Sequence, residues 1–313
     1  MSNETVTLLL SLLYILAGFV SLSVAVYTLK DDNHPSRIPT ALFWIILAVI
    51  FMFGDYIPPA IVGILLVGMG ILTAFKQVKV GNLKNSDDNF RQASSEKIGN
   101  KIFIPALAIA IGAFGFAQIL SKVTNQGGLL GLGAGAILAT ILALIITKSS
   151  PKNVAYDGAR LLDQVGPSSI LPQLLAALGS LFAAAGVGEV ISEGISSVIP
   201  QGNILLGVIA YCLGMAIFTM IMGNGFAAFT VITAGIGIPF VYSQGANPAI
   251  AASLAMTAGF CGTLITPMAA NFNVVPAALL EAKDKNQVIK SQFPVAIIML
   301  VIHIVLMYVW AFK

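Results

Sequence analysis

The sequence predicts an all-α, polytopic membrane protein with about nine or ten membrane segments, some of them broken or re-entrant. Of its 313 residues, 58% are hydrophobic and only 9% are charged, and the mean hydropathy is +0.94. A water-soluble domain carries roughly 25% charged residues. Apolar runs of the length that crosses a bilayer, roughly 20 residues, recur along most of the chain. The 30 glycines and 14 prolines fit close helix packing and broken helices in lipid.

Residues 1–165 are predicted to form an N-terminal region of five plain membrane spans. The expected spans are Thr5–Leu29, Ile38–Phe53, Ala60–Phe75, Ile102–Leu120 and Gly127–Thr147. The N-terminus lacks a basic leader, so we expect the first segment to stay in the protein as a span. Two polar stretches, Lys76–Lys101 and Lys148–Val165, are predicted to be solvated loops, and the first holds six of the 16 basic residues. Because basic loops stay in the cytoplasm, this pattern predicts an outside N-terminus.

Residues 166–313 are predicted to form a C-terminal region of interrupted helices. The expected segments are Ser168–Ile199, Ile204–Met222, Gly223–Val241, Ala249–Leu280 and Phe293–Trp310. In hydrocarbon, a broken helix is tolerated only where its free backbone groups are buried in protein or line a polar cavity. Transporters use such breaks, because half-helix N-termini attract anions and freed carbonyls coordinate cations. Breaks rich in Gly, Pro, Asn, Ser and Thr are therefore the candidate binding sites, and this half is the expected transport region.

Two of the three candidate breaks are short. The first, GPSSILPQ, begins at Gly166 and offers Ser168 and Ser169. It is either a capped helix start at the membrane surface or the beginning of a hairpin near a substrate. The second is Gly-Asn-Gly, centred on Asn224, and is either a surface turn or a buried break.

The third break, GTLITPMAANFN, carries the strongest signal. Pro267 cannot donate a backbone hydrogen bond and disfavours helix at the residue before it. The alternative is a packing helix kinked at this proline. The neutral polar groups here suit a carboxylate, a Na⁺ ion or both, and the candidate binding residues are Thr263, Thr266, Asn271 and Asn273.

Two acidic residues lie inside an apolar segment. Glu189 and Glu193 are four residues apart, so one helical face could hold both. An acid within a membrane segment suggests ion coupling or a proton relay. The alternative is that both side chains reach interfacial water.

Several function classes are disfavoured. The two cysteines and two histidines form no metal-binding or redox spacing. The net charge is +3 without a basic stripe, which disfavours nucleic acid as a partner. No Walker A run and no nucleophile motif of an intramembrane protease is present, so we expect that the protein is not an enzyme and has no cofactor beyond a coupling ion, Na⁺ or H⁺.

Three long runs carry a family resemblance, which covers nearly the whole chain and is densest from Gly166 to Gln292. They read GPSSILPQLLAALGSLFAAAGVG, GNGFAAFTVITAGIG and CGTLITPMAANFNVVPAALLEAKDKNQVIKSQ. The chain resembles a bacterial permease family, formerly of unknown function, that is regarded as one subunit of a 5-oxoproline transporter. The resemblance implies a multi-pass protein of the bacterial cell (inner) membrane, in the lipid bilayer, with a second membrane subunit or a homodimer as partner.

The breaks are also distantly similar to those of the ion-transporter superfamily of carboxylate carriers, whose hairpin tips hold Na⁺ and substrate. Carried over, Asn224, Thr263, Thr266 and Asn271 are tip residues. The expected function is therefore a secondary transporter subunit for a small organic anion, such as 5-oxoproline. The alternative is a passive channel or a scaffold subunit of a membrane complex.

Overall fold

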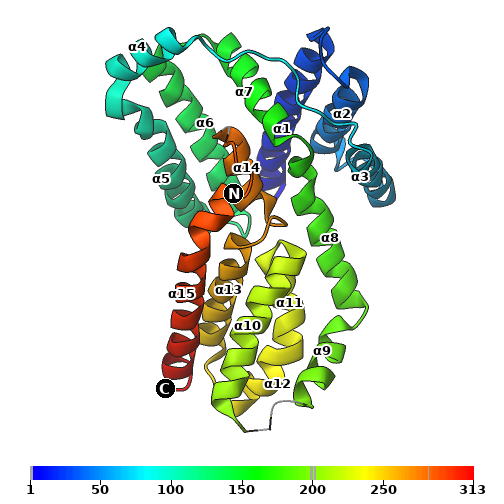
Figure 1. Cartoon of the computed structure of the whole chain (residues 1–313), viewed down its shortest axis with the longest axis vertical. Coiled ribbons are helices and arrows are strands. Elements are labelled where there is room, and N and C mark those ends of the chain that lie inside the picture. The colour runs from blue at the N-terminus through cyan, green and yellow to red at the C-terminus, as the bar shows by residue number, and fades with distance from the viewer. Residues whose placement is uncertain (1–2, 198–199, 201, 281) are drawn as a thin grey trace. The chain divides into compact units, whose positions relative to one another are not determined.

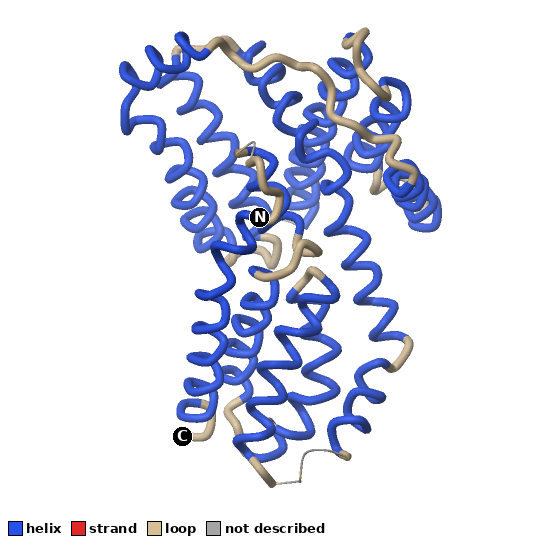
Figure 2. Tube along the Cα trace, viewed as in Figure 1, coloured by secondary structure: helices blue, strands red, loops and turns tan. Residues whose placement is uncertain are grey.

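The computed structural model describes residues 3–197, 200, 202–280 and 282–313, and within these ranges the chain forms helices and loops without strands (Figure 2). Six helical segments there are long and apolar enough to cross a membrane. The apolar helices Arg37–Phe53, Pro59–Ala74 and Pro248–Leu264 are shorter, and a bent helix pair makes a seventh long span if it counts as one. The protein is therefore an all-α, multi-pass membrane protein, as the sequence predicts.

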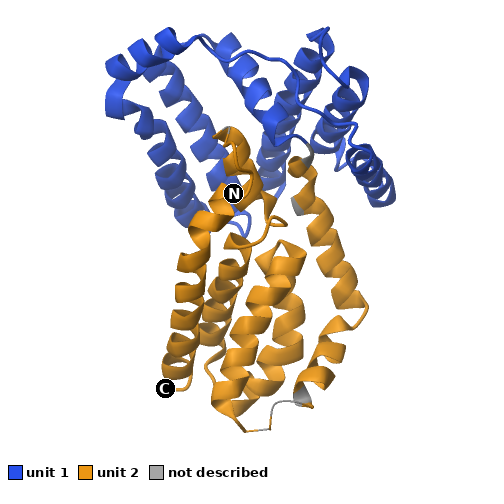
Figure 3. Cartoon of the chain, viewed as in Figure 1, with its two compact units in different colours: residues 1–166 blue, residues 167–313 orange. Residues whose placement is uncertain are grey.

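The chain divides into two compact units, residues 1–166 and 167–313 (Figure 3). Unit 1 contains α1 (Asn3–Lys30), α2 (Arg37–Phe53), α3 (Pro59–Ala74), α4 (Asp88–Ile98), the short turn η1 (Gly99–Ile102), α5 (Phe103–Leu120), α6 (Gly127–Thr147) and α7 (Pro151–Val165). Within this unit α1 packs on α2, and α5 packs on α6.

Glycines bring α5 and α6 into close contact. A Cβ atom on Gly131 would lie 2.6 Å from the carbonyl oxygen of Ala113, and one on Gly135 would lie 2.9 Å from the amide nitrogen of the same residue. Side chains at these two positions would push the helices apart, so the small residues let the backbones meet, as is common between helices in lipid. None of the residues of α5 is buried inside unit 1, which leaves its apolar surface to lipid or to another protein.

Both stretches of unit 1 that were predicted to be solvated loops contain a helix, α4 in the first and α7 in the second, so neither is a loop throughout. The side chain of Ser150 accepts a hydrogen bond from Lys152 N, and Pro151 occupies the first turn, which together begin α7. The side chain of Asp87 caps α4 in the same way, by accepting from Asn89 N. These caps satisfy free backbone amides at the start of each helix, which favours helix formation in two stretches of mostly polar sequence.

Unit 2 contains the broken helices. They are α8 (Leu171–Ala184), α9 (Val187–Ser196), α10 (Ile204–Met222), α11 (Gly225–Ile232), the π-helical turn η3 (Thr233–Gly237), α12 (Ile238–Phe240), η4 (Tyr242–Gln244), α13 (Pro248–Leu264), α14 (Ala270–Leu279) and α15 (Gln287–Trp310), after the turn η2 (Gly166–Ile170). The predicted segment Ser168–Ile199 forms two helices that separate at Gly186, whose φ is +70°. Its last two residues, 198 and 199, lie outside the described part of the chain.

The core of unit 2 lies between α10, α13 and α15, which run side by side (Figure 1). Tyr211, Cys212 and Met215 of α10 are fully buried there. A Cβ atom on Gly262 of α13 would lie 2.1 Å from the carbonyl oxygen of Ala216, so α10 and α13 touch backbone to backbone near their ends. This contact places the breaks that follow the two helices next to each other.

Candidate functional site

The site is built from two helix breaks in unit 2. The first separates α10 from α11 at Gly223 and Asn224, and the second separates α13 from α14 over residues 265–269. Gly223 has a φ of +64°, and a Cβ atom on it would lie 2.4 Å from the carbonyl oxygen of Met268. Only glycine meets both conditions, so Gly223 is what lets the two breaks cross in contact.

Thr266 joins the two breaks by hydrogen bonds. Its hydroxyl donates to the carbonyl oxygen of Met220, near the end of α10, at 2.9 Å. It also accepts from the amide of Met268 at 3.2 Å. The side chain is buried, at 4% exposure. Thr266 therefore supplies a donor to a carbonyl that the interrupted α10 leaves free.

Asn273 holds the end of α13. Its Nδ2 donates to the carbonyl oxygens of Thr263 and Thr266, both at 2.7 Å, and the residue is fully buried. Both amide hydrogens are thus used on carbonyls that a continuous helix would have satisfied. Its Oδ1 has no partner in the described part of the chain. Thr266 and Asn273 are both framework residues of the crossing, behind the surface that a ligand could touch.

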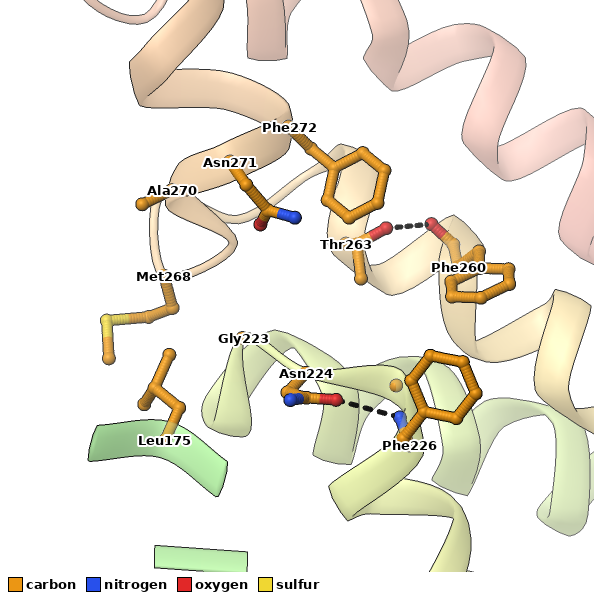
Figure 4. A pocket seen from close by; sticks show the side chains of 11 residues that line it. Leu175, Gly223, Asn224, Phe226, Phe260, Thr263, Met268, Ala270, Asn271 and Phe272 are labelled. Carbon is orange, nitrogen blue, oxygen red and sulfur yellow. Dashed lines mark hydrogen bonds between the residues drawn. The ribbon is translucent and has the colours of Figure 1, made fainter. Parts of the chain in front are cut away.

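A cavity of about 300 Å³ lies between the breaks (Figure 4). Three of the predicted binding residues, Asn224, Thr263 and Asn271, are among those that line it. The other lining residues are Leu175, Gly223, Gly225, Phe226, Phe260, Met268, Ala270 and Phe272.

Hydrogen-bond donors of both breaks are available to this cavity. Asn224 Oδ1 caps α11 by accepting from the amides of Phe226 and Ala227, at 2.9 and 3.3 Å, which leaves Nδ2 as a donor. The side chain of Asn271 makes no hydrogen bond to any described residue and lies at the cavity in Figure 4. Most backbone N–H groups in the first turns of α11 and α14 are already bonded within the two breaks, to Asn224, Met268 and Ala269. The N–H groups of Gly225 and Asn271 are the two that have no partner among the described residues. Thr263 contributes less, because its hydroxyl donates to the carbonyl of Phe260 at 2.7 Å.

The remaining wall is apolar and aromatic. Phe226 and Phe260 meet edge to face, with ring centroids 6.2 Å apart, and Phe272 lies at the opposite break. None of the lining residues is charged. The sequence analysis missed these aromatic residues, because a phenylalanine within an apolar run carries no signal that separates a cavity wall from a lipid-facing surface. The arrangement suits a small anion that has an apolar portion, held by the neutral donors of the two helix breaks.

The other predicted residues lie elsewhere in the chain. Ser168 and Ser169 belong to η2, before α8, and neither lines the cavity; Ser169 Oγ is buried without a partner among the described residues. Glu189 and Glu193 are exposed on α9. Glu189 is in the first turn of that helix, where a negative charge is favoured by the helix dipole. A coupling role for the two acids stays a prediction.

Residues 11–312 match the family described as "Protein of unknown function (DUF979)". No curated protein and no solved structure is significantly similar to this chain.

Proposed function

We propose that this chain, which belongs to that family of unknown function, is a secondary transporter subunit that carries a small organic anion across the bacterial inner membrane. The observation that supports the proposal best is the crossing of two helix breaks around an uncharged cavity lined by amide donors. A membrane protein gains nothing in stability from free donors at a helix break, since each costs free energy in hydrocarbon. A bound ligand is the physical reason to keep them.

The chemistry of the wall narrows the ligand class. A carboxylate would accept hydrogen bonds from Asn224 Nδ2, from the side-chain amide of Asn271 and from the backbone N–H groups of Gly225 and Asn271, which have no partner among the described residues. The rings of Phe226, Phe260 and Phe272 would pack on an apolar or flat portion of the same molecule. The volume of about 300 Å³ fits a molecule the size of an amino acid. 5-Oxoproline, a small ring with one carboxylate, is the first candidate, in line with the family resemblance of the sequence.

The cavity lining contains no cationic side chain, and this favours reversible binding during transport over very tight binding of the anion. A lysine or arginine paired with a carboxylate in a dry cavity would hold it strongly, whereas neutral donors give a weaker site from which the anion can leave. We further propose that transport is coupled to Na⁺ or H⁺. The partner would be a second membrane subunit or a second copy of this chain.

Uptake into proteoliposomes tests the proposed transport activity. Purified protein, alone and with a candidate partner subunit, is reconstituted, and radiolabelled 5-oxoproline uptake is measured under an imposed Na⁺ or H⁺ gradient. We expect gradient-driven accumulation that Asn271→Ala abolishes, because the substitution removes a cavity donor and no hydrogen bond of the framework. Equilibration without accumulation would indicate a channel, and transport unchanged in Asn271→Ala would refute the site. The exposed Asn89→Ala, in α4 of unit 1, serves as a matched control.

A further inference from the structure

Asp55 is a single acid in the turn that joins two short apolar helices of unit 1. It lies between α2 and α3 and is the only charged residue from position 38 to position 75. The two helices have 17 and 16 residues, so each is about 25 Å long, whereas the hydrocarbon of a bilayer is about 30 Å thick. With Arg37 and Lys76 at one membrane surface, Asp55 lies near the opposite boundary between hydrocarbon and headgroups.

The protein supplies one hydrogen bond to the side chain of Asp55. The hydroxyl of Ser11, in α1, donates to Asp55 Oδ2 at 3.2 Å. Asp55 has no ion pair with any residue that the structure describes, and its Oδ1 accepts no hydrogen bond from them. An acid at the edge of the hydrocarbon is costly without a positive partner, so its position indicates a functional site.

A cavity of about 320 Å³ lies beside this carboxylate, within unit 1. Its polar side chains are those of Ser11, Tyr14, Asp55 and Tyr56, and no lysine, arginine or histidine lines it. Tyr14 and Phe51 form an aromatic part of the wall, with ring centroids 6.4 Å apart and planes 9° from parallel. The cavity therefore combines one negative charge with hydroxyl groups and aromatic rings.

The C-terminal end of α2 also favours a positive charge in this cavity. The carbonyl oxygen of Phe53, the last residue of the helix, accepts hydrogen bonds from the amides of Tyr56 and Ile57. The carbonyls of Phe51 and Met52 accept none from the turn that follows, and both residues line the cavity. Such carbonyls carry the negative end of the helix dipole, which attracts cations.

The composition of the wall separates the cations that could bind here. A proton on Asp55 would neutralise the charge and leave a cavity of about 320 Å³ unfilled. A hard metal ion takes about six or more oxygen ligands, whereas much of this wall is aromatic or aliphatic. An organic ammonium group bonds to a carboxylate and to hydroxyl oxygens, and it is also attracted to the faces of aromatic rings.

We propose that this cavity binds the primary ammonium group of a membrane lipid headgroup, as in phosphatidylethanolamine. Asp55 would pair with the ammonium charge, Ser11 Oγ and the phenol oxygens would accept its remaining hydrogens, and Tyr14 and Phe51 would pack against it. The depth of Asp55 matches the headgroup level, where tyrosines are enriched, and Tyr56 is 86% exposed there. This site goes beyond the proposed transport function and does not depend on it.

Native mass spectrometry of the full chain in detergent tests the site, with lipids of matched acyl chains added one at a time. Phosphatidylethanolamine should bind most tightly. Phosphatidylcholine should bind more weakly, because its methylated nitrogen cannot donate hydrogen bonds, and phosphatidylglycerol should bind most weakly, because it has no cation. Equal affinities of the wild-type chain for phosphatidylethanolamine and phosphatidylglycerol would overturn the proposal, and this comparison needs no variant.

Substitutions then locate the binding. Asp55→Asn keeps an oxygen that can accept from Ser11 and removes the charge, so it should weaken phosphatidylethanolamine binding about tenfold. Phe51→Leu removes one ring and should weaken it about two- to fivefold. Glu4→Gln, which removes an exposed acid in the first turn of α1, is the matched control and should bind as wild type. Wild-type affinity in Asp55→Asn would place the lipid elsewhere and refute the site.

A soluble headgroup separates the two sources of an ammonium group. Glycerophosphoethanolamine, which has no acyl chains, is added in excess to the complex with phosphatidylethanolamine. Retention of the lipid is the expected result, because the acyl chains also contact the apolar helices. Displacement that Asp55→Asn abolishes would keep the ammonium site and overturn the lipid as its ligand, in favour of a free amine.

Discussion

Asn271 and Asn273 stand two residues apart in α14 and should respond oppositely to the same substitution. Asn273→Ala leaves the carbonyls of Thr263 and Thr266 without their donor, and both residues are buried, at 1% and 4% exposure. A buried polar group left without a partner costs about 1–3 kcal/mol, so the two carbonyls together should cost about 2–6 kcal/mol of unfolding free energy. Asn271→Ala breaks no hydrogen bond among the described residues and should change stability by less than about 0.5 kcal/mol.

Unfolding of both variants in mixed detergent micelles, followed by circular dichroism, measures this difference. The binding of 5-oxoproline, measured on the same preparations by calorimetry, should be lost in Asn271→Ala. A stability of Asn273→Ala within about 0.5 kcal/mol of wild type would refute the framework role of Asn273. Asn273→Asp provides a further check, because a carboxylate cannot donate to the two carbonyls and should be at least as disruptive as alanine.

Two further substitutions test the packing of unit 2. Gly223→Ala would place a side chain at a φ of +64°, with its Cβ atom 2.4 Å from Met268 O. We expect this strain to destabilise the protein by more than about 1 kcal/mol and to reduce transport. Gly63→Ala in α3, where nothing lies within 4 Å of the added Cβ, is its control and should not destabilise. Tyr211→Phe removes a hydroxyl bonded to Thr233 at 2.7 Å and to Tyr242 at 3.0 Å, and should cost about 1–2 kcal/mol in the same unfolding assay. The exposed Tyr308→Phe should cost nothing measurable, and equal effects in the two tyrosine variants would contradict the buried network.

Composition and hydropathy were enough to predict the membrane class and most helices, because the cost of burying polar backbone in lipid permits few alternatives. The breaks were also predictable. Gly-Asn-Gly at Asn224 and Thr-Pro at Pro267 interrupt apolar runs with residues that either cap a new helix or cannot continue the old one. What the sequence did not contain is the contact between the breaks, which depends on the close packing of α10 on α13.

The distinction between cavity residues and framework residues was out of reach for a different reason. Residues two apart on a helix point roughly 200° apart, so Asn271 and Asn273 must face in nearly opposite directions. Which of them faces the cavity depends on where α14 begins, and a shift of its start by two residues would exchange their roles. The pattern ANFN is the same in either case, so only the folded chain separates the two asparagines.

The polar groups at the two helix breaks therefore fall into two classes: those that are hydrogen-bonded within the protein and those that are free to bind a ligand. The donors of Thr266 and Asn273 bind carbonyl oxygens that would otherwise have no hydrogen-bond partner where the helices are interrupted. Those of Asn224 Nδ2 and Asn271 face a cavity. In hydrocarbon, free donors are costly unless water or a ligand occupies the space before them. Because the framework is stabilised without these donors, removing one should weaken ligand binding and leave the fold intact.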